Sequence, residues 1–298
     1  MSPKINKTVL MSGADYFTDD DAINALMDAN IPVNVEAAKA EHALIRQSLE
    51  AAGVSVVKVD APLDCQDGVY TANWALVRHG VAVMARLPNK RKPEEVSALQ
   101  AVKDQGLEPM ILPNDVERFS GQGDALACGD ILFTQSPYRT TTSAHPYLKK
   151  WLGFREVIAL QTKPERRWHG LGPAKINKIT GWPDSPTYDV DLAIAVLKWP
   201  SDGQKGLIAW CPSVFKPTSR KVMQSFDEVD KIEVSHAEAM KAYALNLVST
   251  GETVIMNAGA PKFQAALEAH GLKIVALNLP ELRKGGGSIR CSTLTLDN

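Results

Sequence analysis

The chain has no long apolar segment and no extended run of charge of one sign. Nowhere among its 298 residues do about 18 apolar residues follow one another, as a membrane-spanning helix requires. The first residues, Met-Ser-Pro-Lys-Ile-Asn-Lys, lack the apolar stretch of a secretory signal peptide. The 33 basic and 34 acidic residues nearly cancel, leaving a net charge of −1. This composition argues against a membrane protein and against a nucleic-acid-binding surface.

Cysteine is scarce as well. The four cysteines are far apart and form no Cys-x-x-Cys pair, which argues against a structural zinc site or a disulfide framework. They are Cys65, Cys128, Cys211 and Cys291. No Gly-x-x-x-x-Gly-Lys-[Ser/Thr] loop is present, and Gly-Gln-Gly at 121–123 is only a fragment of a dinucleotide-binding pattern. We therefore expect a protein of the reducing cytoplasm that needs neither a metal nor a cofactor.

A repeated order of elements is present: strand, turn, strand, helix, strand. In the first unit we predict strands at 69–77 and 81–87, a helix at 93–105 and a strand at 108–112. The helix prediction rests on a proline in the first turn and on apolar residues three positions apart. The glycine-bearing turn at 79–80 suits a tight hairpin.

The same order recurs four more times. The predicted elements are 124–127, 131–134, 144–152 and 156–160; then 189–197, 206–210, 217–225 and 231–234; then 243–248, 253–256, 261–270 and 273–277. Both chain ends supply the fifth unit, with strands at 287–296 and 8–12, a helix at 37–52 and a strand at 54–59. Repeats of this size bury each other's faces, and closure by both termini implies a ring. We predict one α/β domain over residues 1–298, a five-unit αβ propeller around a central channel; an ordinary α/β sandwich is the alternative.

The most informative segment is 285–296, Gly-Gly-Gly-Ser-Ile-Arg-Cys-Ser-Thr-Leu-Thr-Leu. Three glycines release the backbone from its normal steric limits, and a single cysteine follows them. This pattern is typical of one reactive side chain placed at the rim of a pocket. The other three cysteines are interpreted as small buried hydrophobic residues.

Together the five units and this segment resemble the guanidino-group-modifying, or pentein, superfamily, which includes arginine deiminase, dimethylarginine dimethylaminohydrolase and glycine amidinotransferase. Residues 67–74 are similar to its first-hairpin motif, 119–124 to its Glu-Gly-Gly-Asp motif and 136–140 to its Ser-x-x-Arg-Thr motif. Residues 188–191 fall where the family has His-x-Asp. The resemblance implies attack of a cysteine thiolate on a guanidinium carbon, a covalent amidino intermediate, and then hydrolysis by water or transfer to an amine.

The resemblance also implies roles for individual residues. Cys291 is the nucleophile, and Asp124 binds the planar guanidinium, a cation that carboxylates recognise best. Arg139 holds a substrate carboxylate. Asn73 hydrogen-bonds a substrate nitrogen, and Asp67 provides further negative charge. Judged by their own surroundings alone, Asp124 also fits a turn cap, Asp67 a strand entry and Arg139 a solvated loop.

Two departures from the family pattern stand out. The glutamate of the Glu-Gly-Gly-Asp motif is missing before Gly121, and Asp189 occupies the place of the histidine that acts as general acid and base. An aspartate, with an ordinary pKa of about 3.9, serves in that role only if burial or a neighbour such as Asp191 raises its pKa. A substitute histidine would be His169, in the insert 166–172; His236 is better explained as a structural residue at a helix start.

The sequence therefore predicts an amidinohydrolase for arginine or a related guanidino compound, with Cys291, Asp189 and Asp191 as its catalytic residues. Two alternatives stay open. An amidinotransferase would use the same site, and a non-catalytic protein would bind the guanidino compound without turnover. The sequence leaves assembly into a homo-oligomer open.

Overall fold

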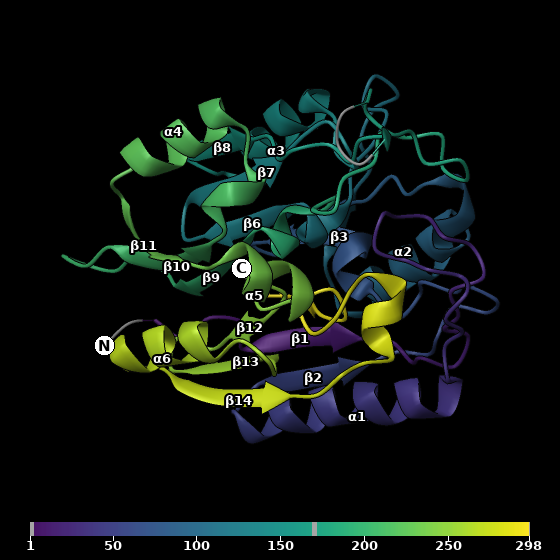
Figure 1. Ribbon diagram of the computed structural model, residues 1–298, viewed down its shortest axis with the longest axis horizontal. Coiled ribbons are helices and arrows are strands. Elements are labelled where there is room, and N and C mark those ends of the chain that lie inside the picture. Colours follow the sequence, from purple (N-terminus) through teal and green to yellow (C-terminus); the bar gives the residue numbers. More distant parts are fainter. Residues whose placement is uncertain (1–2, 169–171, 298) are drawn as a thin grey trace.

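The computed structural model describes residues 3–168 and 172–297, and within them the chain forms five three-stranded sheets (Figure 1). In each sheet the middle strand pairs antiparallel with the first strand and parallel with the last. A helix makes the crossover between the two parallel strands. The predicted five-unit α/β fold is confirmed.

The five units have the following elements. The first contains β3 (Ala75–Arg78), β4 (Val81–Met84), α2 (Glu94–Asp104) and β5 (Glu108–Met110). The second contains β6 (Ala125–Cys128), β7 (Ile131–Gln135), α3 (His145–Leu152) and β8 (Glu156–Leu160). The third contains β9 (Ile194–Lys198), β10 (Gly206–Trp210), α4 (Pro217–Ser225) and β11 (Val229–Glu233). The fourth contains β12 (Val248–Ser249), β13 (Thr253–Asn257), α6 (Pro261–Ala269) and β14 (Lys273–Leu277), preceded by α5 (His236–Lys241). The fifth contains β15 (Leu294–Thr295), β1 (Thr8–Met11), α1 (Val35–Ala51) and β2 (Ser55–Lys58).

The fifth unit joins the two ends of the chain. Val9 of β1 lies opposite Thr295 of β15 in an antiparallel pair and opposite Val56 of β2 in a parallel pair. The first strands of neighbouring units meet: β15 contacts β3, β6 contacts β9, and β9 contacts β12. The inner strands therefore face the centre of the molecule, whereas α1, α3, α4 and α6 lie at its periphery (Figure 1).

Local sequence explains why the outer helices form where they do. The Asn34 side chain accepts a hydrogen bond from the Ala37 backbone nitrogen at 3.0 Å and so caps α1. Proline occupies the first turn of α4 and of α6, where its missing N–H costs no helical hydrogen bond. Along α1 the buried residues Ala38, Ile45 and Leu49 follow helical spacing, and they form the face that packs inward.

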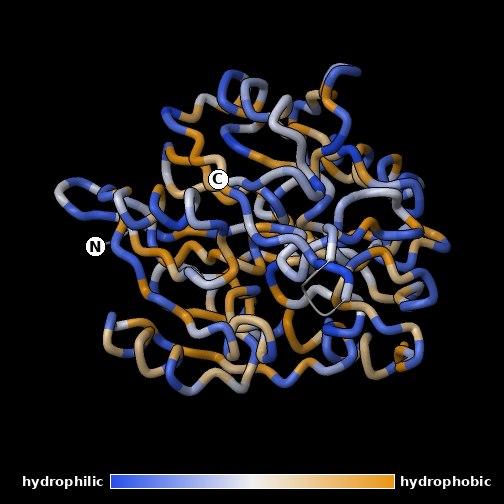
Figure 2. Tube along the Cα trace, turned by 45° about the horizontal axis from the view of Figure 1, so that its top comes forward, coloured by the Kyte–Doolittle hydropathy of each residue, from blue (hydrophilic) through white to orange (hydrophobic). Residues whose placement is uncertain are grey.

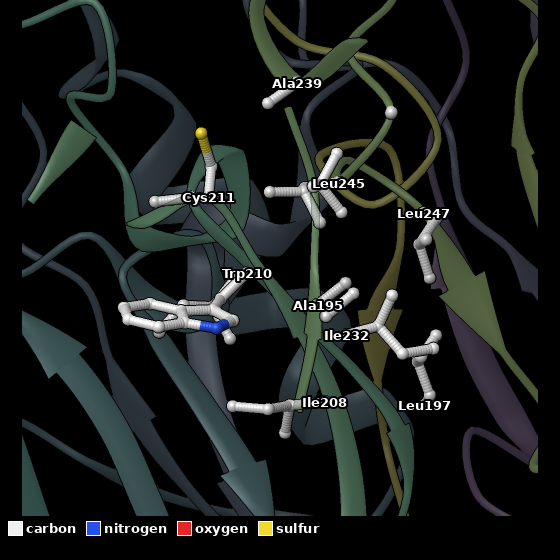
Figure 3. Close-up of a cluster of buried hydrophobic side chains, with 14 of the residues drawn as sticks. Ala195, Leu197, Ile208, Trp210, Cys211, Ile232, Ala239, Leu245 and Leu247 are labelled. Atoms are coloured by element: carbon white, nitrogen blue, oxygen red, sulfur yellow. The ribbon is translucent and has the colours of Figure 1, made fainter. Parts of the chain in front are cut away.

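The largest apolar core lies beneath the second, third and fourth units. Both faces of β9 and β10 are buried in it. Ile208 and Trp210 of β10 point to one side of the sheet, whereas Ala195 and Leu197 of β9 point to the other (Figure 3). Figure 2 shows that the protruding loops are hydrophilic, whereas the strands carry the hydrophobic stretches of the chain. No helix in the described part of the chain is both long and apolar enough to cross a membrane.

The first strand of most units is shorter than predicted. The segment predicted as a strand at 69–77 contains a 3₁₀ turn, Thr71–Trp74, and the strand begins at Ala75. The segment at 189–197 contains another, Val190–Leu192, before β9. Similarly, only Val248 of the segment 243–248 and only Leu294 and Thr295 of the segment 287–296 are strand. Periodicity failed here because a buried turn and a buried strand are equally apolar.

Candidate active site

Three 3₁₀ turns carry polar side chains into the centre of the ring. The turns Thr71–Trp74, Gly121–Gly123 and Val190–Leu192 precede the first strands of units one, two and three, and they pack against one another. They bring together four of the predicted site residues, all at most 2% exposed. These residues are Asn73, Asp124, Asp189 and Asp191.

Cys291 meets them from the fifth unit. Its carbonyl accepts a hydrogen bond from the Ala72 backbone nitrogen at 3.0 Å, which fixes the cysteine turn against the first unit. Gly287 allows this close packing, because a Cβ there would lie 2.9 Å from the Cβ of Cys291. The pattern predicted a cysteine at a rim, whereas the structure buries Cys291 to 2% exposure.

The Cys291 sulfur has two polar partners. Its Sγ–H donates to Asp191 Oδ2 at 3.2 Å, and Asn246 Nδ2 donates to Sγ at 3.1 Å. The Asn246 side-chain oxygen in turn accepts from the Cys291 backbone nitrogen at 3.2 Å. Sequence reasoning missed Asn246, although a lone amide within the apolar stretch 243–248 is a signal that a buried partner exists.

Asn73 connects the first and third units. Its Nδ2 donates to Asp189 Oδ2 at 2.8 Å and to Ser120 Oγ at 2.9 Å. Its Oδ1 accepts from Arg91 at 2.8 Å, so the orientation of the amide is determined from both ends.

A buried ion pair supports Asn73 from behind. Arg91 and Glu94 are each 1% exposed, and Arg91 Nε and Nη2 each donate to one carboxylate oxygen of Glu94 at 2.8 Å. Trp74 Nε1 also donates to Glu94, at 3.1 Å. Sequence reasoning missed both charged residues, because an arginine three positions before a glutamate at a helix start is common on protein surfaces.

Three carboxylate oxygens in the site are buried and lack a hydrogen-bond partner among the residues that the structure describes. They are Asp124 Oδ2, Asp189 Oδ1 and Asp191 Oδ1. The second oxygen of Asp124 accepts from the Val190 backbone nitrogen at 3.0 Å. Buried carboxylate oxygens need N–H or O–H donors, and the cluster therefore has the chemistry to receive a ligand with several N–H groups.

Burial and mutual repulsion shift the pKa values of these groups. Burial and the Asp189 charge raise the pKa of Asp191 to about 8 and that of Asp124 well above its usual value. Burial also raises the pKa of Asp189, although Arg139 and Asn73 oppose this. Burial, Asp191 and Asp189 raise the pKa of the Cys291 thiol well above its usual value. A bound cation would lower all four, since it favours the charged forms.

No protein-family model matches the chain. The N(G),N(G)-dimethylarginine dimethylaminohydrolase of Mycobacterium tuberculosis is 30% identical over 290 residues, which cover 96% of this chain and 84% of the relative. This chain belongs to the guanidino-modifying pentein superfamily.

A second relative of this pentein is the bifunctional arginine dihydrolase/ornithine cyclodeaminase ArgZ of Synechocystis, 29% identical over 295 residues. These residues cover 96% of the pentein described here but only 37% of ArgZ. The N-terminal domain of ArgZ bound to product has a TM-score of 0.82 and 26% identity, covering 97% of this chain and 98% of the domain. The same domain has also been solved covalently bound to a reaction intermediate and, as a cysteine-to-serine variant, bound to substrate.

Asp67 and Arg139 of this pentein are buried, but neither makes a hydrogen bond to Cys291 or to the three aspartates above. Burial raises the pKa of Asp67 to about 6, and its Oδ2 accepts from Gln66 at 2.9 Å. The Arg139 guanidinium lies over the Tyr188 ring, 4.2 Å from its centroid, and donates to the Ile23 carbonyl at 3.2 Å. Its charge lowers the pKa of both Asp67 and Asp189, which places it within electrostatic range of the cluster.

No histidine in the described ranges makes a hydrogen bond to Cys291, Asp189 or Asp191. His169, the histidine considered as a substitute acid and base, lies outside the described residues. His236 is the first residue of α5, which agrees with its interpretation as a residue at a helix start. Within those ranges no three His, Cys, Asp or Glu residues are grouped so as to hold a metal ion.

Proposed function

We propose that this pentein is an amidinohydrolase that cleaves a guanidino compound with Cys291 as its nucleophile. One observation carries the proposal. Three buried carboxylate oxygens without a hydrogen-bond partner among the described residues lie in the same cluster as a cysteine that is hydrogen-bonded to one of these carboxylates. A guanidinium is a planar cation with several N–H donors, and it matches such a set in both charge and hydrogen bonding.

Binding of the cation is the first step. Its positive charge lowers the pKa values of the surrounding carboxyls and of the thiol, so that the aspartates become acceptors. Asp124 and Asp189 then accept N–H bonds through the oxygens that have no partner within the described protein. These contacts orient the guanidinium carbon toward Cys291 Sγ.

Formation of the covalent intermediate follows. The Cys291 thiol gives its proton to Asp191 Oδ2, 3.2 Å away, and the sulfur forms a bond to the guanidinium carbon. The bond from that carbon to the leaving nitrogen breaks, and the amine takes the proton that Asp191 received. The product of this half-reaction is an amidino group on the sulfur and a neutral amine.

Water completes the reaction. It adds to the amidino carbon while Asp191 accepts one of its protons, and the carbon–sulfur bond then breaks to leave a ureido product. Of the two protons freed, one restores the thiol and the other leaves on the amine as ammonium. Asp191 thus serves as both acid and base. Burial and the Asp189 charge raise its pKa to about 8 in the unliganded site, and the bound cation lowers it toward neutral pH, where proton exchange is most effective.

The relatives support this proposal. The ArgZ domain has been solved with a covalent reaction intermediate, and the Mycobacterium tuberculosis relative is named a dimethylarginine dimethylaminohydrolase. Arginine or a related guanidino acid is the substrate class that we propose, with Arg139 as the partner of its carboxylate. The bifunctional relatives are much longer than this chain, and their second activity is not included in the proposal.

A guanidino-binding protein without turnover is the second candidate. It is favoured by one observation, that Asp189 occupies the position of the family's catalytic histidine and no described histidine is hydrogen-bonded to the cysteine. An amidinotransferase would share every contact and differ only in the group that attacks the intermediate.

Mass spectrometry of the intact protein separates these functions. The protein is incubated briefly with a panel of guanidino compounds and quenched in acid, alongside Cys291→Ser and the control Cys211→Ser. An adduct of amidino mass that Cys291→Ser lacks and Cys211→Ser retains supports covalent catalysis. Calorimetric binding without any adduct supports the binding protein, and loss of the adduct only when an amine is added supports transfer.

A further inference from the structure

The Asn246 amide contacts Cys291 at two points. Asn246 is fully buried, and its Oδ1 accepts from the Cys291 backbone nitrogen at 3.2 Å while its Nδ2 donates to Sγ at 3.1 Å. Because the backbone N–H occupies the oxygen end of the amide, the nitrogen end is directed at the sulfur. The two contacts together define the orientation of a hydrogen-bond donor toward the reacting atom.

We propose that Asn246 is a catalytic residue that stabilises the Cys291 thiolate by hydrogen bonding. This inference deepens the proposed function and rests on Cys291 as its nucleophile. The task is distinct from that of Asp191, which takes the proton. Two nearby carboxylates oppose negative charge on the sulfur, whereas a neutral amide donor favours that charge and has no proton to exchange at neutral pH.

The charged and titratable groups around the sulfur come from several units. They are Asp189, Asp191, Tyr70, Tyr188, Tyr243 and Arg290. Against the upward effect of burial and the two aspartates, hydrogen bonds from the Ser288 backbone and then from the Asn246 side chain lower the pKa of Cys291. The same amide also lowers the pKa of Asp191. Loss of Asn246 should therefore raise the pKa values of Cys291 and Asp191, so that both groups stay protonated to a higher pH.

A second asparagine provides a matched control. Asn257 Nδ2 donates to the carbonyls of Tyr243 and Asn246 at 3.1 and 3.5 Å, and its Oδ1 accepts from Ser288 Oγ at 2.8 Å. It is buried to 1% exposure, like Asn246, but has no hydrogen bond to the sulfur or to Asp191. Asn257 thus supports the backbone behind Asn246 without touching the reacting atoms.

The test is an ultraviolet absorbance titration of the thiolate in the full-length protein. Subtraction of the Cys291→Ser curve isolates Cys291. In Asn246→Leu we expect the apparent pKa of Cys291 to rise by about 1–2 units, the equivalent of a hydrogen bond to a charged group. Asn246→Asp keeps the size and the acceptor for the backbone nitrogen, and its pKa shift should have the same direction. Asn257→Leu should lower the melting temperature but leave the apparent pKa of Cys291 unchanged.

Two results would overturn the proposal. One is an unchanged Cys291 titration in whichever Asn246 variant is folded by circular dichroism. The other is an equal shift in Asn257→Leu, which would assign the effect to general loosening of the fold. Failure of the proposed function is a separate result, because the absence of any amidino adduct in the wild type leaves the titration fully readable.

Discussion

The Asn73 side chain donates from one nitrogen to Asp189 Oδ2 at 2.8 Å and to Ser120 Oγ at 2.9 Å, so three units of the ring meet at a single amide. In Asn73→Ala the Asp189 carboxylate loses this donor, and its pKa, already raised by burial, should rise further. An unsatisfied buried acceptor costs about 1–3 kcal/mol, which should appear as a lower urea midpoint. Asn30→Ala, at an exposed asparagine, is the control. An unchanged midpoint in Asn73→Ala would contradict the role of this amide as a junction.

Gly123 is required by the same junction. A Cβ at this position would lie 2.8 Å from Asp189 Oδ2 and closer still to Asn73 Nδ2, so Gly123→Ala must push the two side chains apart. Displacements of this size at a reacting centre reduce kcat/KM by about 10²-fold. Gly80→Ala is the comparison, because Gly80 has a positive φ but no atom lies within 4 Å of where a methyl group would be added. It should lower stability and retain turnover; full activity in Gly123→Ala would disprove the packing argument.

Much of this architecture was predictable from sequence. Turns with glycine between short apolar runs recur in the four units that are continuous in sequence, and a helix follows each of them; both signals are local. The inner turns were not predictable, because an apolar stretch containing a buried polar residue fits a strand as well as a 3₁₀ turn. Thr71–Trp74 and Val190–Leu192 are the clearest examples.

The candidate site was predicted only in part. The resemblance identified the aspartates and Cys291 by their motifs, and the structure brings Asp124, Asp189 and Asp191 into the same buried cluster as the cysteine. Asn246, Arg91 and Glu94 were not predicted as site residues. Each acts through a contact between distant segments or through burial, and the sequence alone reveals neither. An arginine and a glutamate three residues apart have the same pattern on a surface as in a core.

The Arg91–Glu94 pair should behave as a buried ion pair whose halves are not independent. Arg91→Met leaves Glu94 charged and buried, at a cost of about 3–5 kcal/mol. Adding Glu94→Leu removes that charge, and most of the lost stability should return in a urea titration. Activity should not return, because Asn73 Oδ1 has lost the donor that orients its amide. Recovery of both stability and turnover in the double variant would show that Arg91 has no positioning role.

The unliganded protein should become less stable as the pH rises from about 5 to 8. The folded pKa values of Asp67, about 6, and Asp191, about 8, exceed those of the unfolded chain, so the folded state binds more protons over this range. The stabilisation is complete below about pH 4, the pKa of an aspartate in the unfolded chain, and is lost as the pH passes through the folded values. Asp191→Asn should flatten the upper part of the profile and Asp67→Asn the lower part, as measured by denaturant midpoints at each pH. A wild-type midpoint that rises toward pH 8 would show that these carboxyls are ionised in the folded state.

Replacing Asp189 by histidine tests the main departure from the family pattern. An imidazole has a pKa of about 6.5 and exchanges protons readily at neutral pH, so Asp189→His should create or increase arginine hydrolysis. Asp189→Asn is the matched control, because it keeps the size of the side chain but does not titrate, and it should not show the increase in arginine hydrolysis. Ureido product and released ammonia are measured together, since hydrolysis must yield both. An active wild type with an inactive Asp189→His would give the opposite answer. The reaction would then require the carboxylate that Asn73 contacts and not a group that exchanges protons, and Asp189 would be adapted to another guanidino substrate.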